Sequence, residues 1–576
     1  MRKNLLLFAV LTPLFCIGQT NMLITSSTTE QVIIGNYDPA PYAGTQVLDP
    51  VDLASQLEDA ISPDSLKASL IKLATFRTRN SGSDTVSTTE GYGAARRWAF
   101  QKFKEISQAN NNRLLPSYFQ FDQSICGMGQ HSNVLGVLPG SVPSSGFILV
   151  EGHMDSRCAS VCDVDCVAEG IEDNGSGTAL VLELARVMAQ YEFPNTIVFM
   201  ITTAEEQGLY GAQAFAIYAQ QNNLPLRAVL NNDVIGGIIC GKTSSAPSCP
   251  GLNDIDSIGV RLFSQGGYNS KNKQLARFIK LEYQENLLPY VAVPMDIRIM
   301  SPEDRSGRGG DHIPFRQRSF AAMRFTSANE HGNASNNTGY TDRQHTSDDV
   351  LGVDTDGDMV VDSFFVDFNY LARNTLINAN AASIAARNVP LPPDFTAIRS
   401  NDKLIMNFNT AIDTQTIRIA LRSVTNDWDT VYTLSPSFSD ELFCNPSLPL
   451  YVSVAGVDNY GAESLFSSEK IVSTSATKDP ETAEDKGIEL YQNHPNPFDE
   501  ATWISFFVHK MPATVSNSFV QISDHQGKVI QQLPVQIKPG MNEVLYSHGY
   551  GVTGAFVYTL IVNGRKIESK QMIFAN

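Results

Sequence analysis

Short apolar runs alternate with amphipathic stretches from about residue 60 to residue 388. The apolar runs that predict buried strands are 146–153, 196–203, 228–235 and 320–326. Stretches with apolar residues at helical spacing are 90–107, 177–191 and 209–221. This alternation predicts the α/β class, as an α/β/α sandwich with helices on both faces of a mixed but mostly parallel central sheet.

The pattern changes after a proline cluster that begins at Pro390. Within residues 389–472, short alternating stretches at 403–408, 416–421 and 451–457 are typical of a small antiparallel sandwich. Residues 473–487 are polar and predict a linker that is open to proteolysis. Another β-patterned block follows at 488–576, so we expect two small all-β sandwich domains after the α/β domain.

The first 18 residues predict a secretory signal peptide. A basic start precedes an apolar run from Leu5 to Ile17, which is too short to cross a hydrocarbon core of about 30 Å. Cys16 and Gly18 then place small residues before a cleavage site. We therefore expect residues 1–18 to be removed on export, with residues 19–59 left as an N-terminal extension.

Charge and hydropathy exclude several classes of protein. The chain has 60 acidic against 42 basic residues and a net charge of −18, so we expect no nucleic-acid partner. The N-terminal run is the only long apolar segment, so we expect no integral membrane segment. With the signal peptide, this predicts a protein that is secreted or held at the cell surface.

Export also changes the interpretation of the cysteines. Seven follow the signal peptide: Cys126, Cys158, Cys162, Cys166, Cys240, Cys249 and Cys444. In an oxidising compartment they favour disulfides over metal thiolates. The spacing predicts a disulfide between Cys240 and Cys249. We also expect Cys126 to pair with one of Cys158, Cys162 and Cys166, and the sequence does not indicate which.

Acidic and imidazole side chains follow several of the predicted strands. They are His153, Asp155, Asp173, Glu205, Glu206, Asp233 and His345. Functional sites of open α/β sheets form at this edge, where the strands end. Two histidines and several carboxylates without a cysteine suit zinc, and a set of this size can hold two ions if one carboxylate bridges them.

A second acidic cluster resembles a calcium-binding loop. Asp354, Asp356, Asp358 and Asp362 occupy positions 1, 3, 5 and 9 of such a loop. Position 6 lacks glycine, and Phe365 stands where a glutamate is expected at position 12. A Ca²⁺ site and a solvated acidic loop therefore both stay open.

Residues 60–388 resemble peptidase family M28, the dinuclear zinc aminopeptidases. The likeness rests on GHMDS, EDNGSG, TTAEEQG, NND and HTSDD, in family order. It implies a zinc-peptidase fold with two Zn²⁺ ions and peptide substrates. His153 and Asp233 would hold one ion, Glu206 and His345 the other, and Asp173 would bridge both.

The same resemblance assigns the remaining roles. Glu205 would be the general base that takes a proton from the attacking water, and Asp155 would orient His153. The bond after Asp173 would be a cis peptide, and Asp311 and His312 would contribute to the pocket. Where some relatives carry a carbonyl-polarising tyrosine directly before the final histidine, this chain has Gln344, so the oxyanion-stabilising residue is open.

Two further resemblances concern the β-patterned blocks. The stretch YVSVAGVDNYGAES, near residue 460, is similar to the last strands of a fibronectin type III domain. The block at 488–576 opens with YQNHPNPF and resembles the C-terminal sorting domain by which Bacteroidetes cross the outer membrane. That resemblance implies export through the periplasm and the type IX secretion machinery as a partner.

The complete set of ligands favours a secreted aminopeptidase that removes N-terminal residues from peptides. A carboxypeptidase or a glutaminyl cyclase of the same family is the enzymatic alternative. A non-catalytic surface binding protein on the same fold is the other, although it would predict eroded ligands.

Overall fold

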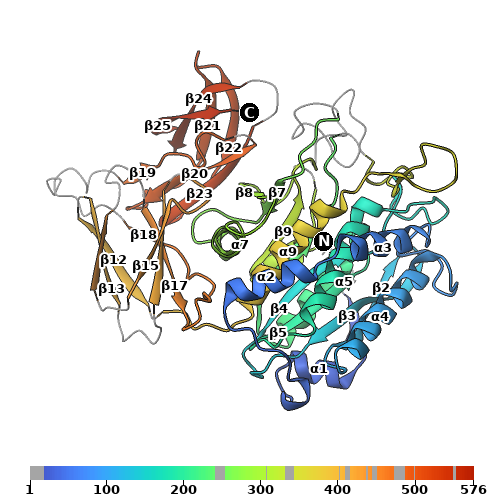
Figure 1. Ribbon diagram of the computed structural model, residues 1–576. Helices are drawn as coiled ribbons and strands as arrows, with labels where there is room; N and C mark the ends of the chain where they lie inside the picture. Colours follow the sequence, from blue (N-terminus) through green and yellow to red (C-terminus); the bar gives the residue numbers. More distant parts are fainter. Residues whose placement is uncertain are drawn as a thin grey trace, which may run out of the picture.

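The computed structural model describes residues 19–240, 253–305, 308–330, 343–392, 394–400, 402–408, 416–423, 425–435, 439–443, 450–472, 487–498, 500–548 and 553–575. Its largest unit is a nine-stranded sheet in the order β1-β2-β3-β5-β4-β6-β9-β7-β8 (Figure 1). The strands are β1 (Thr20–Ile24), β2 (Leu115–Ile125), β3 (Met128–Leu138), β4 (Phe147–His153), β5 (Thr196–Thr202), β6 (Leu226–Asn232), β7 (Gly259–Phe263), β8 (Asp296–Ile299) and β9 (Ala322–Ser327).

The four strands predicted from apolar runs are confirmed as β4, β5, β6 and β9. They are almost entirely buried, which is why their sequences are apolar on both faces. β4 pairs in parallel with β5 on one side and with β6 on the other. The carboxyl ends of these three strands therefore lie at one edge of the sheet.

The expectation of a mostly parallel sheet is wrong. Four neighbouring pairs are parallel and four are antiparallel, and β1, β2 and β3 form an antiparallel extension. β2 and β3 are joined by a tight turn at Cys126 and Gly127, and strands joined so closely are necessarily antiparallel. Within residues 19–59, β1 pairs with β2 and forms the edge of the sheet.

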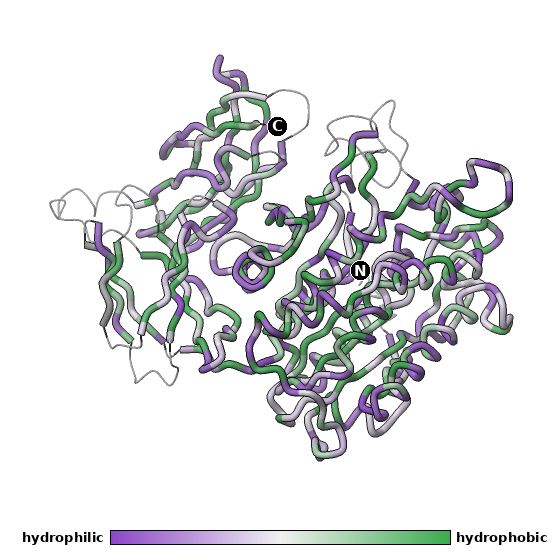
Figure 2. Tube along the Cα trace, in the orientation of Figure 1, coloured by the Kyte–Doolittle hydropathy of each residue, from purple (hydrophilic) through white to green (hydrophobic). Residues whose placement is uncertain are grey.

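Helices cover both faces of this sheet, as predicted (Figure 1). One face packs against α2, α3, α4, α5, α7 and α9 around the main hydrophobic core, and the other packs against α1, α6 and α8. The hydrophobic segments gather at the centre of this unit (Figure 2). The helices are α1 (Ser27–Ile33), η1 (Ala40–Tyr42), α2 (Pro50–Ala60), α3 (Pro63–Ala74), α4 (Gly91–Ala109), η2 (Ile171–Gly175), α5 (Ser176–Met188), α6 (Tyr210–Gln221), α7 (Lys271–Asn286), α8 (His312–Gln317) and α9 (Phe368–Ala385).

Two smaller β regions follow a short hairpin of β10 (Gly352–Val353) and β11 (Ser363–Phe364). Each region consists of a three-stranded and a four-stranded antiparallel sheet around its own core. The middle β region comprises β12 (Phe395–Ser400), β13 (Lys403–Phe408), β14 (Thr416–Arg422), β15 (Thr430–Leu434), β16 (Ser439–Phe443), β17 (Leu450–Val457) and β18 (Lys470–Val472). The C-terminal β region comprises β19 (Ile488–Leu490), β20 (Ala501–Val508), β21 (Phe519–Asp524), β22 (Val529–Pro534), β23 (Gly540–Ser547), β24 (Gly554–Val562) and β25 (Arg565–Phe574).

Most of the described cysteines form disulfides. Cys126 pairs with Cys162, which confirms that its partner is one of the three expected cysteines. Cys158 pairs with Cys166. Their Cα atoms lie 5.2 and 6.3 Å apart, respectively. Cys240 is also disulfide-bonded, but its predicted partner Cys249 lies outside the described residues, so that pairing stays a prediction.

Three other expectations fall on segments that the structure does not describe. They are the signal peptide at 1–18, nearly all of the linker at 473–487, and the cysteine at position 444. Among the described helices, none combines the length and the hydropathy needed to span a bilayer.

Candidate metal centre

Three neighbouring strands deliver most of the predicted site. His153 is the last residue of β4, and Asp233 directly follows β6. Glu205 and Glu206 lie in the turn after β5. Because these strands are parallel, all four side chains start from the same edge of the sheet.

Asp173 comes from η2, directly before α5. The Asp173–Asn174 peptide bond is cis, as predicted. The carboxylate of Asp349 accepts hydrogen bonds from the backbone N–H groups of Glu172 and Asp173, at 2.9 and 3.0 Å. The side chain of Asn174 accepts from the backbone of Val234 at 3.3 Å, so this turn is tied to the end of β6.

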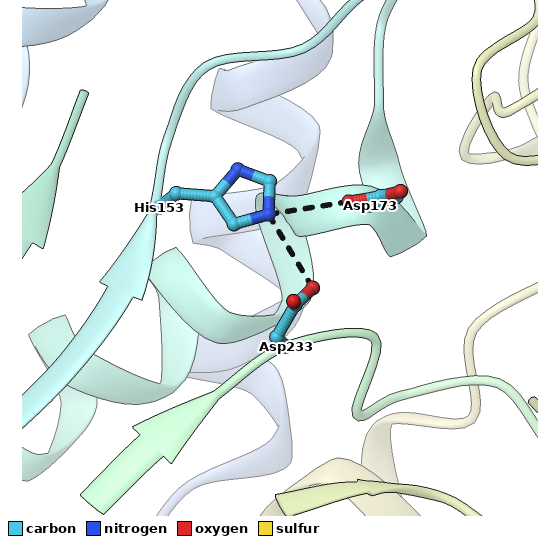
Figure 3. Close-up of side chains that lie close together, drawn as sticks. All are labelled: His153, Asp173 and Asp233. Atoms are coloured by element: carbon cyan, nitrogen blue, oxygen red, sulfur yellow. Dashed lines mark hydrogen bonds and ion pairs between the residues drawn. The ribbon is translucent and has the colours of Figure 1, made fainter. Parts of the chain in front are cut away.

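The structure brings the five predicted ligands into two groups that share Asp173. In the first, His153 Nε2 lies 3.2 Å from Asp173 Oδ1 and 3.3 Å from Asp233 Oδ1 (Figure 3). In the second, His345 Nε2 lies 3.2 Å from Asp173 Oδ2 and 3.1 Å from Glu206 Oε2. Within each group the potential ligand atoms lie within 4.8 Å of one another.

A bound metal ion explains the arrangement of these residues better than their contacts with one another do. The first group is buried, with His153 only 1% exposed. Glu206 Oε1 is buried and has no hydrogen-bond partner. Burial alone would lower the pKa of His153, but the carboxylates of Glu205 and Asp233 hold it well above its ordinary value. Such an excess of buried carboxylate charge is a good environment for divalent cations.

Asp155 has a wider role than the predicted one. Its Oδ1 lies 3.7 Å from His153 Nδ1, while its backbone oxygen lies 3.0 Å from the same nitrogen. Its two carboxylate oxygens accept from the backbone N–H groups of Glu205 and Glu206, at 3.2 and 3.1 Å. Asp155 therefore links the end of β4 to the turn that carries the two glutamates.

The carboxyl group of Glu205 lies among other acids. Burial raises the pKa of Glu205 well above its ordinary value. His153 opposes this effect, whereas Asp233 and Glu206 add to it. A carboxyl group with a raised pKa holds a proton more readily, which is the property required of a general base that must also return the proton.

Four residues that contact the site were not assigned from sequence, and one of them, Arg308, lies 3.3 Å from His345 Nδ1. Arg324 lies 3.2 Å from Asp233 Oδ2, and Arg157 Nε lies 2.7 Å from Glu206 Oε2. Asp349, described above, belongs to the quoted HTSDD motif. Arg324 carried a usable signal, since it is the single charged residue of an apolar strand. Arg157 stands two residues after Asp155 and had no signal of its own.

The other predicted pocket residues lie outside the two ligand groups. Asp311 accepts a hydrogen bond from the hydroxyl of Thr202, and His312 Nε2 lies 3.1 Å from the backbone oxygen of Glu303. Gln344 Nε2 donates to Glu330 at 3.2 Å.

The calcium-like loop is present as an exposed acidic cluster. Potential ligand atoms of Asp354, Asp356 and Asp362 lie within 4.8 Å of one another, and Asp358 is not part of that group. Oxygens of this cluster already accept backbone N–H groups of the loop, as Asp354 Oδ1 does from Gly357 at 2.7 Å.

Comparison with known proteins identifies the family. The model of peptidase family M28 matches residues 133–358. A probable zinc metalloprotease of Pyrenophora tritici-repentis is 30% identical over 372 residues, which cover 62% of this chain and 80% of the relative. The chain belongs to peptidase family M28. It is therefore a zinc metallopeptidase, a hydrolase of peptide bonds.

A second relative agrees with this assignment. A probable zinc metalloprotease of Pyricularia oryzae is 32% identical over 371 residues, covering 59% of this M28 peptidase and 68% of the relative. Among solved structures, the LapA aminopeptidase of Legionella pneumophila is 19% identical, with a TM-score of 0.42, over 60% of this chain and 77% of its own.

Proposed function

We propose that this M28 peptidase is a secreted aminopeptidase that works with two zinc ions. His153 and Asp233 would hold one ion, Glu206 and His345 the other, and Asp173 would contribute one oxygen to each. The observation that carries the proposal is the sharing of Asp173, whose two oxygens lie 3.2 Å from two different histidines. With a single ion, one of these histidines would lie beside buried carboxylates without ligating a metal.

The residues around this centre support a division of labour. When bound, zinc supplies Lewis acidity, which acidifies water and polarises a peptide carbonyl. Glu205 would take the proton from the attacking water and return it to the leaving amine. Asp155 would keep Glu205 in place through the backbone hydrogen bonds at 3.2 and 3.1 Å to the two glutamates. Asp349 and Asn174 would hold the turn of Asp173.

The substrate end is decided by a panel of model substrates. Aminoacyl-nitroanilides have a free α-amino group, so an aminopeptidase should cleave them and should lose that activity when the same amino group is acetylated. Cleavage of N-blocked peptides from their C-terminal end would indicate a carboxypeptidase, and ring closure of N-terminal glutamine would indicate a glutaminyl cyclase. Binding without turnover in the zinc-loaded protein would favour the non-catalytic alternative.

Export of the enzyme is part of the proposal. Two disulfides support an oxidising compartment, since cytosolic proteins rarely keep them. We propose that residues 1–18 are a signal peptide and that the C-terminal β region acts as a type IX sorting domain, with release or surface attachment outside the cell. In the native host, deletion of residues 488–576 should trap the enzyme in the periplasm. Normal export without that segment would contradict the sorting role.

The domain limits and the calcium loop also remain proposals. We propose a peptidase domain at 60–388, joined by the strand β1 that precedes it, then a fibronectin type III-like domain at 389–472 and the sorting domain at 488–576.

Calcium at Asp354, Asp356 and Asp362 is testable by isothermal titration of the zinc-loaded protein. Absence of a heat signal with millimolar Ca²⁺ would leave the loop as a solvated acidic cluster.

A further inference from the structure

A disulfide-bonded loop lies against the second ligand group. Cys162 in this loop is joined to Cys126 at the β2–β3 turn, and Cys158 is joined to Cys166. The backbone oxygen of Val161 accepts hydrogen bonds from Asn80 at 2.9 Å and from Gln207 at 3.1 Å. Gln207 directly follows Glu206, so the loop is fixed beside the turn that carries the glutamates.

Arg157, at the start of this loop, contacts two of the three ligands in the second group. Its Nε lies 2.7 Å from Glu206 Oε2, and one terminal nitrogen lies 2.8 Å from His345 Nδ1. The other terminal nitrogen donates to the backbone oxygens of Cys158 and Ala159, each at 3.3 Å. The side chain of Arg157 is 16% exposed, so these partners hold it in a mostly buried position.

The first ligand group also has an arginine, but its charge is balanced. Arg324 lies 3.2 Å from Asp233 and 3.0 Å from Asp304, which is not one of the candidate ligands. Asp304 also pairs with Arg305 at 3.0 Å, and Arg305 in turn pairs with Glu330, so the charge of Arg324 is balanced within a network that contains carboxylates outside the ligand groups. Within the described part of the chain, Glu206 is the carboxylate that forms an ion pair with Arg157. Arg157 thus adds positive charge to the second group without a compensating acid.

Arg157 opposes a divalent cation at this position in three ways. An arginine stays protonated at any pH that the protein meets, so its repulsion of a cation is permanent. Its hydrogen bond to Glu206 Oε2 also competes with a metal for the same oxygen. In addition, an imidazole that ligates through Nε2 carries its proton on Nδ1 and needs an acceptor there, whereas His345 Nδ1 faces two guanidinium donors, Arg157 at 2.8 Å and Arg308 at 3.3 Å.

We propose that Arg157 is a positioning residue that makes the site of Asp173, Glu206 and His345 the weaker and more exchangeable of the two metal positions. The inference rests on the proposed two-metal function. It differs from that function because it concerns the effect of Arg157 on one of the two positions, and not the number of ions or the reaction.

The test is a zinc titration of the full-length protein without its metals, in competition with a chromogenic chelator, with zinc content checked by mass spectrometry. For the unaltered protein we expect two bound ions with unequal dissociation constants. Arg157→Gln, which removes the charge, should lower the dissociation constant of the weaker position at least tenfold. The dissociation constant of the tighter position should stay unchanged. Arg157→Lys keeps the charge and should restore a weak second position.

Matched variants make each result decisive. Arg157→Met, measured in parallel, keeps the apolar stem of the side chain and should reproduce the Gln result. Arg77→Gln is the control, because Arg77 is 61% exposed and pairs with Glu90 instead of a candidate ligand. If both Arg157→Gln and Arg157→Met bound the second zinc ion as weakly as the unaltered protein does, or more weakly, this inference would be wrong. The proposed two-metal function would not be affected. A single bound zinc in the unaltered protein would overturn the proposed two-metal function and this inference with it.

Discussion

The metal centre and the junction around α7 both bury charged side chains, and they do so in opposite ways. At the junction, Glu469 of the middle β region lies 2.9 Å from Arg277 of α7 and 2.7 Å from Arg422 of β14. It also accepts the backbone N–H of Asn269 at 3.0 Å. All three charged side chains are at most 1% exposed. In Figure 2 the coil of α7 is mostly hydrophilic, although it lies between the large sheet and the smaller β regions.

The metal centre lacks this pairing of each buried charge with one of the opposite sign. Carboxyl groups of Asp155, Asp173, Asp233, Glu205 and Glu206 converge there, and guanidinium groups reach two of them. A buried ion pair is tolerated when each charge has partners, and a buried excess of one sign is costly unless a counter-ion binds. The balance of buried charges therefore distinguishes a structural ion network from a cation site, and no sequence motif is needed for this distinction. The predictions below test that separation.

The largest expected effect is on catalysis at the centre. Glu205→Gln should lower kcat by about 10³-fold, because the amide cannot accept the proton of the attacking water. Zinc content should be unchanged, since Glu205 belongs to neither ligand group. Glu206→Gln should instead lose one zinc ion. Kinetics on a nitroanilide substrate and elemental analysis of each purified variant provide the measurement.

The pair of variants contains its own control. If Glu205→Gln lost zinc while Glu206→Gln retained both ions, the two roles would be exchanged. Glu105→Gln, at an exposed helical pair with Lys102, should change neither quantity.

The second prediction concerns the junction. Glu469→Gln leaves Arg277 and Arg422 buried without their counter-charge, so the free energy of unfolding should fall by about 3–5 kcal/mol. Zinc content and kcat should stay unchanged, because none of these residues contacts a ligand group. Denaturant unfolding followed by fluorescence, with the α7 region reported by Trp428, measures the loss. A loss below about 1 kcal/mol would mean that the junction is no more than a surface pair.

Sequence predicted the parts of the molecule that depend on local pattern. β4, β5, β6 and β9 were visible because strands buried on both faces have continuous apolar runs. β2 was not, because its buried and half-buried residues mix along the strand. The candidate ligands were visible because each follows a strand or lies in a short motif.

What the sequence could not give are contacts between distant segments. Asp349 holds the Asp173 turn from 176 residues away, and Arg157 reaches His345 across 188 residues. Such partners have no periodicity or spacing that marks them. The same holds for Glu469, which meets Arg277 only because the middle β region packs on α7. The charge balance of either region therefore becomes evident only in three dimensions.

The third prediction is a difference in pH dependence between two glutamates of the middle β region. Burial would raise the pKa of Glu469, but Arg422 and Arg277 outweigh it and lower that pKa to about 2. Burial raises the pKa of Glu463 from 4.5 to about 8, although Arg418 opposes it. Glu469 therefore stabilises the fold above pH 4.5, and that contribution is lost as the pH falls toward 2. Glu463 stabilises the fold below pH 4.5, and that contribution is lost as the pH rises through 8.

Unfolding midpoints measured from pH 3 to pH 9 should show both effects. Glu469→Gln should flatten the acid side of the stability profile, and Glu463→Gln should flatten the alkaline side. Glu282 and Glu285 face the same Arg418 and Glu463, so a profile of Glu282→Gln distinguishes a shared titration from that of Glu463 alone. Identical profiles for the unaltered protein and Glu463→Gln would contradict the assignment.

The smallest effect is expected from removing the C-terminal β region. This region touches the large unit through polar contacts: Glu543 accepts the backbone N–H of Tyr268 at 2.6 Å, Trp503 donates to the backbone oxygen of Ser301 at 3.2 Å, and Glu500 lies 3.5 Å from Arg261. None of these contacts reaches a candidate ligand. A protein that ends near residue 475 should therefore keep both zinc ions and a kcat within about twofold, since no group that moves a proton is lost. Its stability should fall by the contribution of a few hydrogen bonds, about 0.5–1.5 kcal/mol each, and of the Arg261–Glu500 ion pair. Loss of turnover in the folded, zinc-loaded truncation would show that the C-terminal region acts on the metal centre through α7, and the two regions would then not be independent.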